Sequence, residues 1–433
     1  MAAGPERWRN WAGDQSCLPA ETVHARDREQ LAAAIAAAAE AGRKVSVAGS
    51  GHSFTEAALT AGTLIRVESL CGVLDADLGS GLVRVGGGTI LADLNEELAG
   101  LGLAMENLGD IDRQTIAGAV STGTHGTGAG LRSISAQVAA IELVLADGSV
   151  RELDAAAGPL LAAARVGVGA LGAISAVTLR CVPAFTLERV DAPRPREEVF
   201  DRFEELATAN DHFELFTFPY ADSALVLERN RTAAPPRPRG AVAAFLNDVV
   251  LENWALEALA ATGKALPRTI PALSRLAGRL ASGSRTSDRS DRVFANQRRV
   301  RFTEMEYAVP REHGPQAARR VIEWVRANRY PVFFPIEMRV GAAEDALLGP
   351  AHGRDTAYIA VHQYRGMEWR PYFEAVEAIM DEYEGRPHWG KRHFQTAATL
   401  ASRYPAWAEF QRARDELDPT RVFSNEYAAR VLG

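Results

Sequence analysis

The chain has 433 residues, more than one ordinary hydrophobic core accommodates, so two domains are expected. Hydrophobic residues make up 47% of it and charged residues 24%, the composition of a folded globular protein. The 48 basic and 55 acidic side chains give a net charge of -7, which repels phosphate backbones and anionic lipid. We therefore expect no nucleic-acid partner.

The cysteines and the apolar runs bear on the location of the protein. Cys17, Cys71 and Cys181 are scattered and show no C-x-x-C spacing, so neither a disulfide framework nor a thiolate metal site is indicated. The longest apolar run, at 31–39, is about half of a membrane span. No apolar stretch follows the charges of the N-terminus, as a signal peptide would require. These features predict a cytoplasmic protein without a membrane span.

The first part of the chain reads as an α+β domain. An Ala-rich helix is expected at 28–42, and a short strand breaks into glycines after it. Short β-rich runs follow at 63–90, then a helix at 90–101. The segment 137–153 has the pattern of a hairpin around Asp147-Gly148, and a strand follows it at 174–182.

The pattern of the sequence changes at about residue 186. Up to about 384, helical stretches alternate with strands such as PVFFPIEMRV and TAYIAVHQY, which predicts a second domain of α/β layers. The polar segments 233–240 and 281–291 are expected to be loops. Glycine and turn residues return at the C-terminal end. The predicted division is therefore 1–185, 186–384 and 385–433.

Two common site motifs are rejected. The spacing G-x-G-x-x-G occurs once, at 167–172, but a strand and not a helix follows it, so it is interpreted as a structural tight turn. His388 and His393 lie five residues apart, a poor spacing for metal ligands on a helix or a strand. We expect no metal.

Two glycine-bearing segments are more informative. In VAGSGHSF, at 47–54, Gly49 and Gly51 free the backbone after a strand, so successive N–H groups can converge on an anion. A plain small-residue turn is the alternative for this segment. GDIDRQTIAGAVSTGTHGTGAG, at 109–130, contains six glycines and has no charged residue after Arg113. Such glycine density suggests a flat ligand pressed onto bare backbone, and two such loops predict a dinucleotide bound in an extended form.

Together with HWGKRH (388–393) and DPTRVFSNEYAARVLG (418–433), these segments resemble the flavoproteins of the vanillyl-alcohol-oxidase type. Within them the chain is most similar, end to end, to the sugar-1,4-lactone (aldonolactone) oxidoreductases of the L-gulono-1,4-lactone dehydrogenase and oxidase kind. The resemblance implies an α+β fold: a two-subdomain PCMH-type FAD-binding domain, built from the N-terminal part and the C-terminal tail, with an inserted α/β cap domain for the substrate.

The resemblance also implies FAD as the cofactor. The histidine at the position of His52 bonds covalently to the flavin 8α-methyl group in this family, although His52 could instead only hydrogen-bond the cofactor. The neighbours expected at the FAD phosphates are Gly49, Ser50, Gly51 and Ser53. Those expected along the isoalloxazine and pyrophosphate are Gly118, Ser121, Thr122, Gly123, Thr124, His125 and Gly126, and a purely structural role stays open for His125.

Glu337 and Arg339 stand two apart in an apolar strand, so they point to one face, where two charges must pair or bind something. An exposed salt bridge is the alternative. By resemblance, this pair binds the substrate hydroxyls, with His362 as a weaker companion. Lys391 matches a lysine beneath the flavin pyrimidine ring, where its charge offsets the anionic reduced flavin; a surface lysine is the alternative.

The implied activity is oxidation of the C2 hydroxyl of an aldono-1,4-lactone, with hydride transfer to flavin N5 and the hydroxyl proton going to Glu337 or solvent. Reoxidation would be by O2 or by an electron carrier such as cytochrome c. An alditol or oligosaccharide oxidase is one alternative, and a sugar-binding or flavin-storage protein is another. Ala119 stands where some alditol oxidases have a serine, which favours the lactone.

Overall fold

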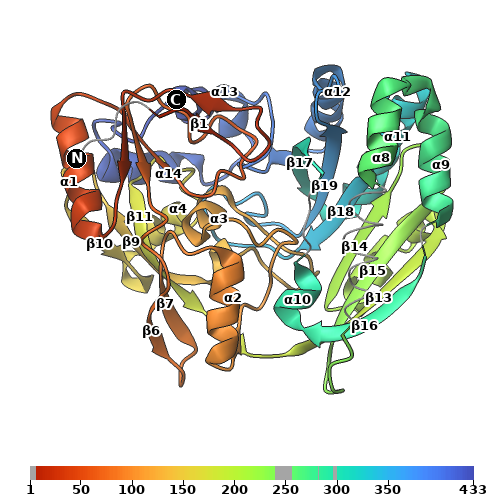
Figure 1. The fold of residues 1–433 in the computed structure, drawn as a ribbon, viewed down its shortest axis with the longest axis horizontal. Coiled ribbons are helices and arrows are strands. Elements are labelled where there is room, and N and C mark those ends of the chain that lie inside the picture. Colours follow the sequence, from red (N-terminus) through yellow and green to blue (C-terminus); the bar gives the residue numbers. More distant parts are fainter. Residues whose placement is uncertain (1–5, 239–255, 281, 296–299) are drawn as a thin grey trace.

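Two bodies lie side by side in the molecule (Figure 1). This computed structural model describes residues 6–238, 256–280, 282–295 and 300–433. The N-terminal domain and the chain's C-terminal end occupy one side, and a broad sheet with its helices, here called the cap, occupies the other.

A three-stranded parallel sheet opens the N-terminal domain. Helix α1 (Arg28–Glu40) lies where the Ala-rich helix was predicted. Asp27 caps it, because its side chain accepts a hydrogen bond from the Gln30 N–H, and Leu31 and Ile35 pack into the core beside the sheet. The strands in sheet order are β3 (Glu21–His24), β5 (Thr63–Arg66) and β4 (Val45–Ala48).

A five-stranded antiparallel sheet completes the domain. The predicted hairpin is confirmed, with Gly148 at a φ of +80° in its turn. The strands in sheet order are β10 (Val150–Leu153), β9 (Val138–Val144), β11 (Ala173–Arg180), β7 (Leu82–Gly86) and β6 (Val73–Asp77). The helices are α2 (Leu91–Gly100), α3 (Ile116–Thr122) and α4 (Pro159–Ala164). Two short pairs are β1 (Trp8–Arg9) with β2 (Ser16–Cys17), and β8 (Leu103–Ala104) with β12 (Val182–Pro183).

The cap is built on an eight-stranded sheet in which neighbouring strands run antiparallel. Its strands in sheet order are β16 (Ser284–Arg289), β13 (Thr186–Pro195), β15 (Ser223–Thr232), β14 (His212–Thr217), β18 (Ile336–Gly341), β19 (Thr356–Tyr364), β17 (Phe302–Pro310) and β20 (Arg386–Pro387). Its helices are α5 (Arg196–Asp201), α6 (Phe203–Ala209), α8 (Leu256–Ala265), α9 (Ile270–Leu280), α10 (Ser290–Phe294), α11 (Gly314–Ala327) and α12 (Arg370–Asp381).

The two faces of the cap sheet differ in chemistry because side chains alternate along each strand. Apolar residues such as Met305, Met338 and Ile359 form one core with α5, α6, α11 and α12. The intervening residues of the same strands include charged side chains that are nevertheless buried, since this face turns toward the N-terminal domain: Glu214, Glu304, Glu306, Glu337 and Arg339.

The C-terminal segment connects both bodies. After β20 at the edge of the cap sheet, it forms α13 (Ala397–Ala401), α14 (Trp407–Leu417) and α15 (Glu426–Leu432). These helices return to the N-terminal domain, where Phe410 and Tyr427 share a core with Leu94 and Val85. The N-terminal domain is thus completed by the C-terminal segment, as the sequence implied, while the boundaries at 185 and 384 stay predictions.

The expectation of a loop at 281–291 was wrong. Residues 284–289 form β16, which pairs with β13, and 290–294 form α10. Polar residues are accommodated because β16 is an edge strand, where they find partners such as Asp191, whose carboxylate accepts from the Ser284 hydroxyl at 2.8 Å. Residue 281 and residues 239–240 of the other expected loop lie outside the described residues.

Within the described ranges, no helix combines the length and the apolar character that a bilayer span needs.

Replacing Phe410 by Ala tests the packing of the C-terminal segment on the N-terminal domain. Phe410 is fully buried in the shared core, so Phe410→Ala should lower the free energy of unfolding by about 3–5 kcal/mol. Urea denaturation measures it. The control Leu78→Ala, at a largely exposed side chain, should change stability by less than about 0.5 kcal/mol; equal effects of the two would contradict this packing.

Candidate functional site

A cavity opens in the N-terminal domain between three chain segments, 47–58, 114–122 and 168–174. Both predicted glycine-bearing segments contribute to its wall. Of the predicted cofactor-binding residues, the wall contains Gly49, Ser50, Gly51, His52, Ser53, Gly118, Ser121 and Thr122.

Glycine is required where the two loops meet. A Cβ atom on Gly49 would lie 2.1 Å from the Thr115 hydroxyl oxygen, so no larger residue fits there. Gly51 has a φ of +72°, a left-handed conformation that other residues rarely adopt. The Thr115 N–H donates to the Ser50 hydroxyl at 3.2 Å, which holds the loops together. The result is bare backbone on both sides of the cavity.

The second loop divides into two parts at the end of α3. Gly123 ends that helix with a φ of +72°, and the chain then turns away from the cavity toward the cap sheet. The predicted residues Gly123, Thr124, His125 and Gly126 are consequently absent from the wall described above. Their contact with a cofactor stays a prediction.

The segment at 168–174 was missed as part of the site. Val168 and Gly169 have φ values of +52° and +74°, and Gly172 and Ile174 also line the cavity. The strand β11 does follow this turn, so the usual dinucleotide fingerprint is absent, as expected. The glycine spacing was nevertheless a signal that the backbone here lies close to a ligand site.

His52 projects from the first loop against Trp11, whose indole was not predicted to contribute. Their rings stack with centroids 5.5 Å apart and planes at 24°. Burial, followed by the charges of Lys391 and Arg113, lowers the pKa of His52 to about 4. The ring is therefore neutral near pH 7 and retains a nucleophilic lone pair.

Glu337 and Arg339 lie on one face of β18, as the alternation predicted, and they form a buried ion pair. Arg339 also binds Asp110 of the N-terminal domain, with Nη2 2.9 Å from Oδ1, and its Nε donates to Glu214 at 3.0 Å. Arg229 lies 2.6 Å from the other oxygen of Glu214. An exposed salt bridge is therefore excluded.

The cluster alternates acidic and basic groups. The carboxylates of Asp110, Glu214 and Glu337 contact the guanidinium groups of Arg229 and Arg339. Burial raises the pKa of Glu214, but Arg229 and Arg339 outweigh burial and lower it overall. Glu214 thus stays ionised.

Lys391 and His362 both contact the carboxylate of Glu304. The sequence did not indicate Glu304 as part of the site. Lys391 is paired with Glu304, and His362 Nε2 lies 3.5 Å from the same carboxylate. Burial raises the pKa of Glu304, but Lys391 and then His362 overcome this and lower it to about 2. The Lys391 side chain is only 17% exposed, so it is not a surface lysine.

The segment containing Lys391 also reaches the first loop. The Phe54 N–H donates to the Gly390 carbonyl at 2.8 Å, and the Lys391 ammonium lies 5.3 Å from the centre of the Phe54 ring. The two motifs that the sequence placed more than three hundred residues apart are thus neighbours. His52 and Lys391 consequently lie close enough for the charge of Lys391 to act on the imidazole.

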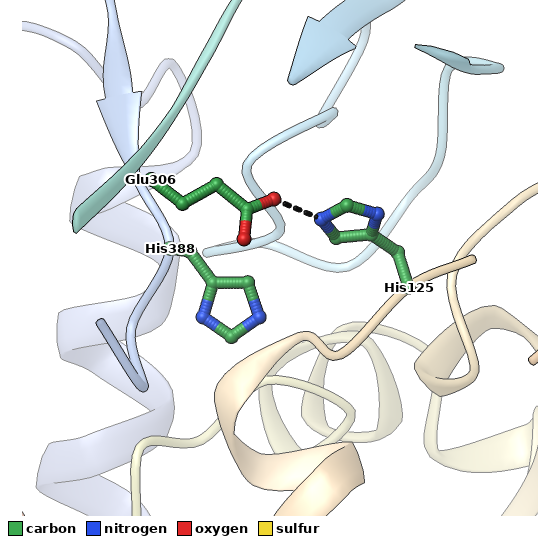
Figure 2. A group of neighbouring side chains, drawn as sticks. All are labelled: His125, Glu306 and His388. Carbon is green, nitrogen blue, oxygen red and sulfur yellow. Dashed lines mark hydrogen bonds and ion pairs between the residues drawn. The ribbon is translucent and has the colours of Figure 1, made fainter. Parts of the chain in front are cut away.

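A further group, His125, Glu306 and His388, lies at the junction of the two bodies (Figure 2). His125 Nε2 is 2.6 Å from a Glu306 oxygen. Burial, the largest of several influences, lowers the pKa of His388 to about 3. His393, considered with His388 in the sequence, lies instead 2.9 Å from the Tyr427 hydroxyl.

Comparisons with known proteins show the family of the chain. Residues 19–154 match the family described as FAD binding domain, and residues 177–431 match the family described as D-arabinono-1,4-lactone oxidase. The chain is 50% identical to an L-gulono-1,4-lactone dehydrogenase of Mycobacterium tuberculosis, covering 98% of this chain and 99% of the relative. It is 31% identical to mouse L-gulonolactone oxidase and 30% identical to a Streptomyces alditol oxidase, with 98% of each chain covered in both cases.

Solved structures show the same fold. A solvent-stable cholesterol oxidase superimposes with a TM-score of 0.84 at 20% identity, covering 98% of this chain and 97% of the other. The chain therefore has the fold of this oxidase, with a match to the FAD-binding-domain family in its N-terminal part. Within that fold, the chain belongs to the D-arabinono-1,4-lactone oxidase family.

Buried histidines should make the protein sensitive to acid. The pKa is lowered to about 4 for His52 and His212 and to about 3 for His388 and His393, mainly by burial. The unfolded chain takes up protons at about pH 6.5, before the folded state does. As the pH falls from about 6.5 toward the pKa of the folded state, each of these histidines therefore lowers the free energy of unfolding by up to about 1.4 kcal/mol per pH unit.

Thermal unfolding between pH 7.5 and pH 5 measures this loss. His393→Gln should reduce the pH slope, whereas the control His24→Gln, at an exposed side chain, should leave it unchanged. A melting temperature that stays constant over this range would contradict the prediction.

Proposed function

We propose that the protein is an FAD-dependent aldonolactone oxidoreductase that oxidises the C2 hydroxyl of an aldono-1,4-lactone, with L-gulono-1,4-lactone as the first substrate to test. The observation that carries the proposal is the buried Glu337–Arg339 pair on the cap face that covers the N-terminal domain. The whole-length similarity to L-gulono-1,4-lactone dehydrogenase supports the substrate class.

The residues around the cavity fit FAD. Gly49 and Gly51 bring the backbone of the first loop to the cavity wall, where a Cβ atom on Gly49 would collide with Thr115, and Gly118, Ser121 and Thr122 also line the cavity. Neutral His52 is suited to a covalent bond with the flavin 8α-methyl group. When bound, FAD supplies the hydride acceptor for the reaction.

The protein side chains have separate roles in this proposal. Arg339 orients and polarises the substrate oxygen, while Glu214 and Asp110 hold its guanidinium in place. Glu337 accepts the hydroxyl proton. Lys391 supplies a fixed positive charge next to the first loop, and His362 lies on the far side of Glu304 as a companion at the substrate.

A lactone is favoured over an open-chain polyol. The chain is 50% identical to an L-gulono-1,4-lactone dehydrogenase but 30% identical to an alditol oxidase, and Ala119 stands where some alditol oxidases have a serine. Activity on a panel of L-gulonolactone, L-galactonolactone, D-arabinonolactone and xylitol distinguishes this proposal from the alditol oxidase alternative. Fast turnover of xylitol alone would contradict the lactone as substrate.

We propose O2 or an electron carrier such as cytochrome c as the electron acceptor and, from the scattered cysteines, a cytoplasmic location.

Acid precipitation tests the His52 bond. The purified protein should be yellow, and its flavin should stay in the acid pellet. His52→Ala should release the flavin to the supernatant, because the nucleophile is gone, whereas the control His24→Ala should not. Flavin in the supernatant from the wild type would contradict covalent attachment and leave noncovalent FAD intact.

Anaerobic flavin reduction tests Glu337 and Arg339. Glu337→Gln and Arg339→Ala should retain flavin but lower the rate of bleaching by the lactone about 100-fold or more, since proton acceptance and orientation are lost. Glu374→Gln, at an exposed ion pair on α12, is the control. Unchanged bleaching would remove both residues from the site.

A further inference from the structure

His125, Glu306 and His388 form a buried cluster that the proposed reaction does not use. They come from the loop after α3, from strand β17 and from the C-terminal segment, and each is no more than 6% exposed. One nitrogen or oxygen atom from each lies within 4.8 Å of the others. Two imidazoles and a carboxylate are also the donor set of many zinc sites, so a zinc ion and a shared proton are both candidates for this cluster.

The hydrogen-bond partners of His125 show which of its ring nitrogens carry a proton. Nδ1 lies 2.8 Å from the Gly126 carbonyl oxygen, which can only accept, so Nδ1 carries a hydrogen. Nε2 lies 2.6 Å from a Glu306 carboxylate oxygen. If His125 carried a proton on Nδ1 alone and Glu306 were ionised, the lone pair of Nε2 would face a lone pair of the carboxylate oxygen at this distance. A second proton must therefore lie between His125 and Glu306.

The geometry does not suit a metal ion. Two ligands of a tetrahedral zinc, each about 2.0–2.1 Å from it, lie roughly 3.3 Å apart, whereas 2.6 Å is a charge-assisted hydrogen-bond distance. His388 Nδ1 accepts from the Gly390 N–H at 3.0 Å, so the neutral ring carries its proton on Nε2. Neither nitrogen of His388 then offers a free lone pair.

The surrounding charges favour a cation at His125. Glu304 and Glu306 stand two residues apart on one face of β17, and Lys391 is paired with Glu304. A protonated His125 balances Glu306. Its ring also stacks on Tyr358 with centroids 3.5 Å apart, an arrangement that a cation strengthens.

We propose that His125 and Glu306 form a buried imidazolium–carboxylate pair, with neutral His388 beside it, and that a proton rather than a metal occupies this cluster. His125 is then a positioning residue. Cross-strand register places Glu306 in one row with Ala360 and Glu337, so the pair fixes the loop after Thr122 at a set distance from Glu337. The ion pair is independent of whether the substrate is a lactone.

The protons can be observed directly by ¹⁵N NMR of histidine-labelled protein, which has nine histidines. In the wild type at neutral pH, His125 should carry a proton on both ring nitrogens, assigned by its loss in His125→Gln. In Glu306→Gln, the amide can donate to Nε2, so His125 should carry only one ring proton. Glu377→Gln, at a buried glutamate bonded to Tyr307, is the control that should change nothing at His125. One ring proton in the wild type, or stoichiometric zinc by metal analysis, would overturn the proposal.

A double-mutant cycle tests the charge separately from the contact. His125→Gln leaves Glu306 without its counter-charge and should lower the melting temperature by roughly 5 °C or more. Glu306→Gln should lose less, and the double variant should recover at least half of the His125→Gln loss because no buried charge is left unpaired. A double variant no more stable than His125→Gln would overturn the ion pair, as would a change in melting temperature on adding zinc or EDTA to the wild type.

Discussion

The burial of a charged sheet face is the constraint on which the rest of the molecule depends. Ions removed from water lose several kcal/mol each unless partners replace their hydration. On the inner face of the cap sheet, the partners come from elsewhere in the chain: Asp110 for Arg339, Lys391 for Glu304, and His125 for Glu306. The same contacts that satisfy these charges therefore hold the cap, the N-terminal domain and the C-terminal segment together, and they bring the reactive groups into one place.

Local rules were sufficient to predict much of the fold and part of the site. Period-two alternation placed Glu337 and Arg339 on one face of a strand, and glycine density indicated where backbone would be exposed to a ligand. The partners of Arg339 could not be predicted, because Asp110 and Glu214 lie on other elements and only the sheet register and the domain junction bring them near. The same holds for Glu304, which reads as an ordinary strand residue until Lys391 is placed beside it.

The errors have physical causes of the same kind. Residues 284–289 have a loop-like composition, but an edge strand tolerates polar side chains on both faces, and pairing with β13 decided the outcome. The glycine turn at 167–172 lacks the helix of a nucleotide fingerprint, yet its position beside the first loop makes it a cavity wall. His125 lies beyond the end of α3, so the direction of the chain after Gly123, rather than its glycine-rich setting, determines what it touches.

The course of the C-terminal segment has a consequence for the order of assembly. His388, Gly390 and Lys391 are synthesised more than three hundred residues after the His52 loop, yet they contact that loop and the inner face of the cap. Phe410 and Tyr427, later still, complete the core of the domain that starts the chain. A ribosome-bound chain that already contains both glycine loops consequently still lacks one side of its site. The wall beside the first loop and the core of the N-terminal domain are thus completed only when the C-terminal segment has been synthesised.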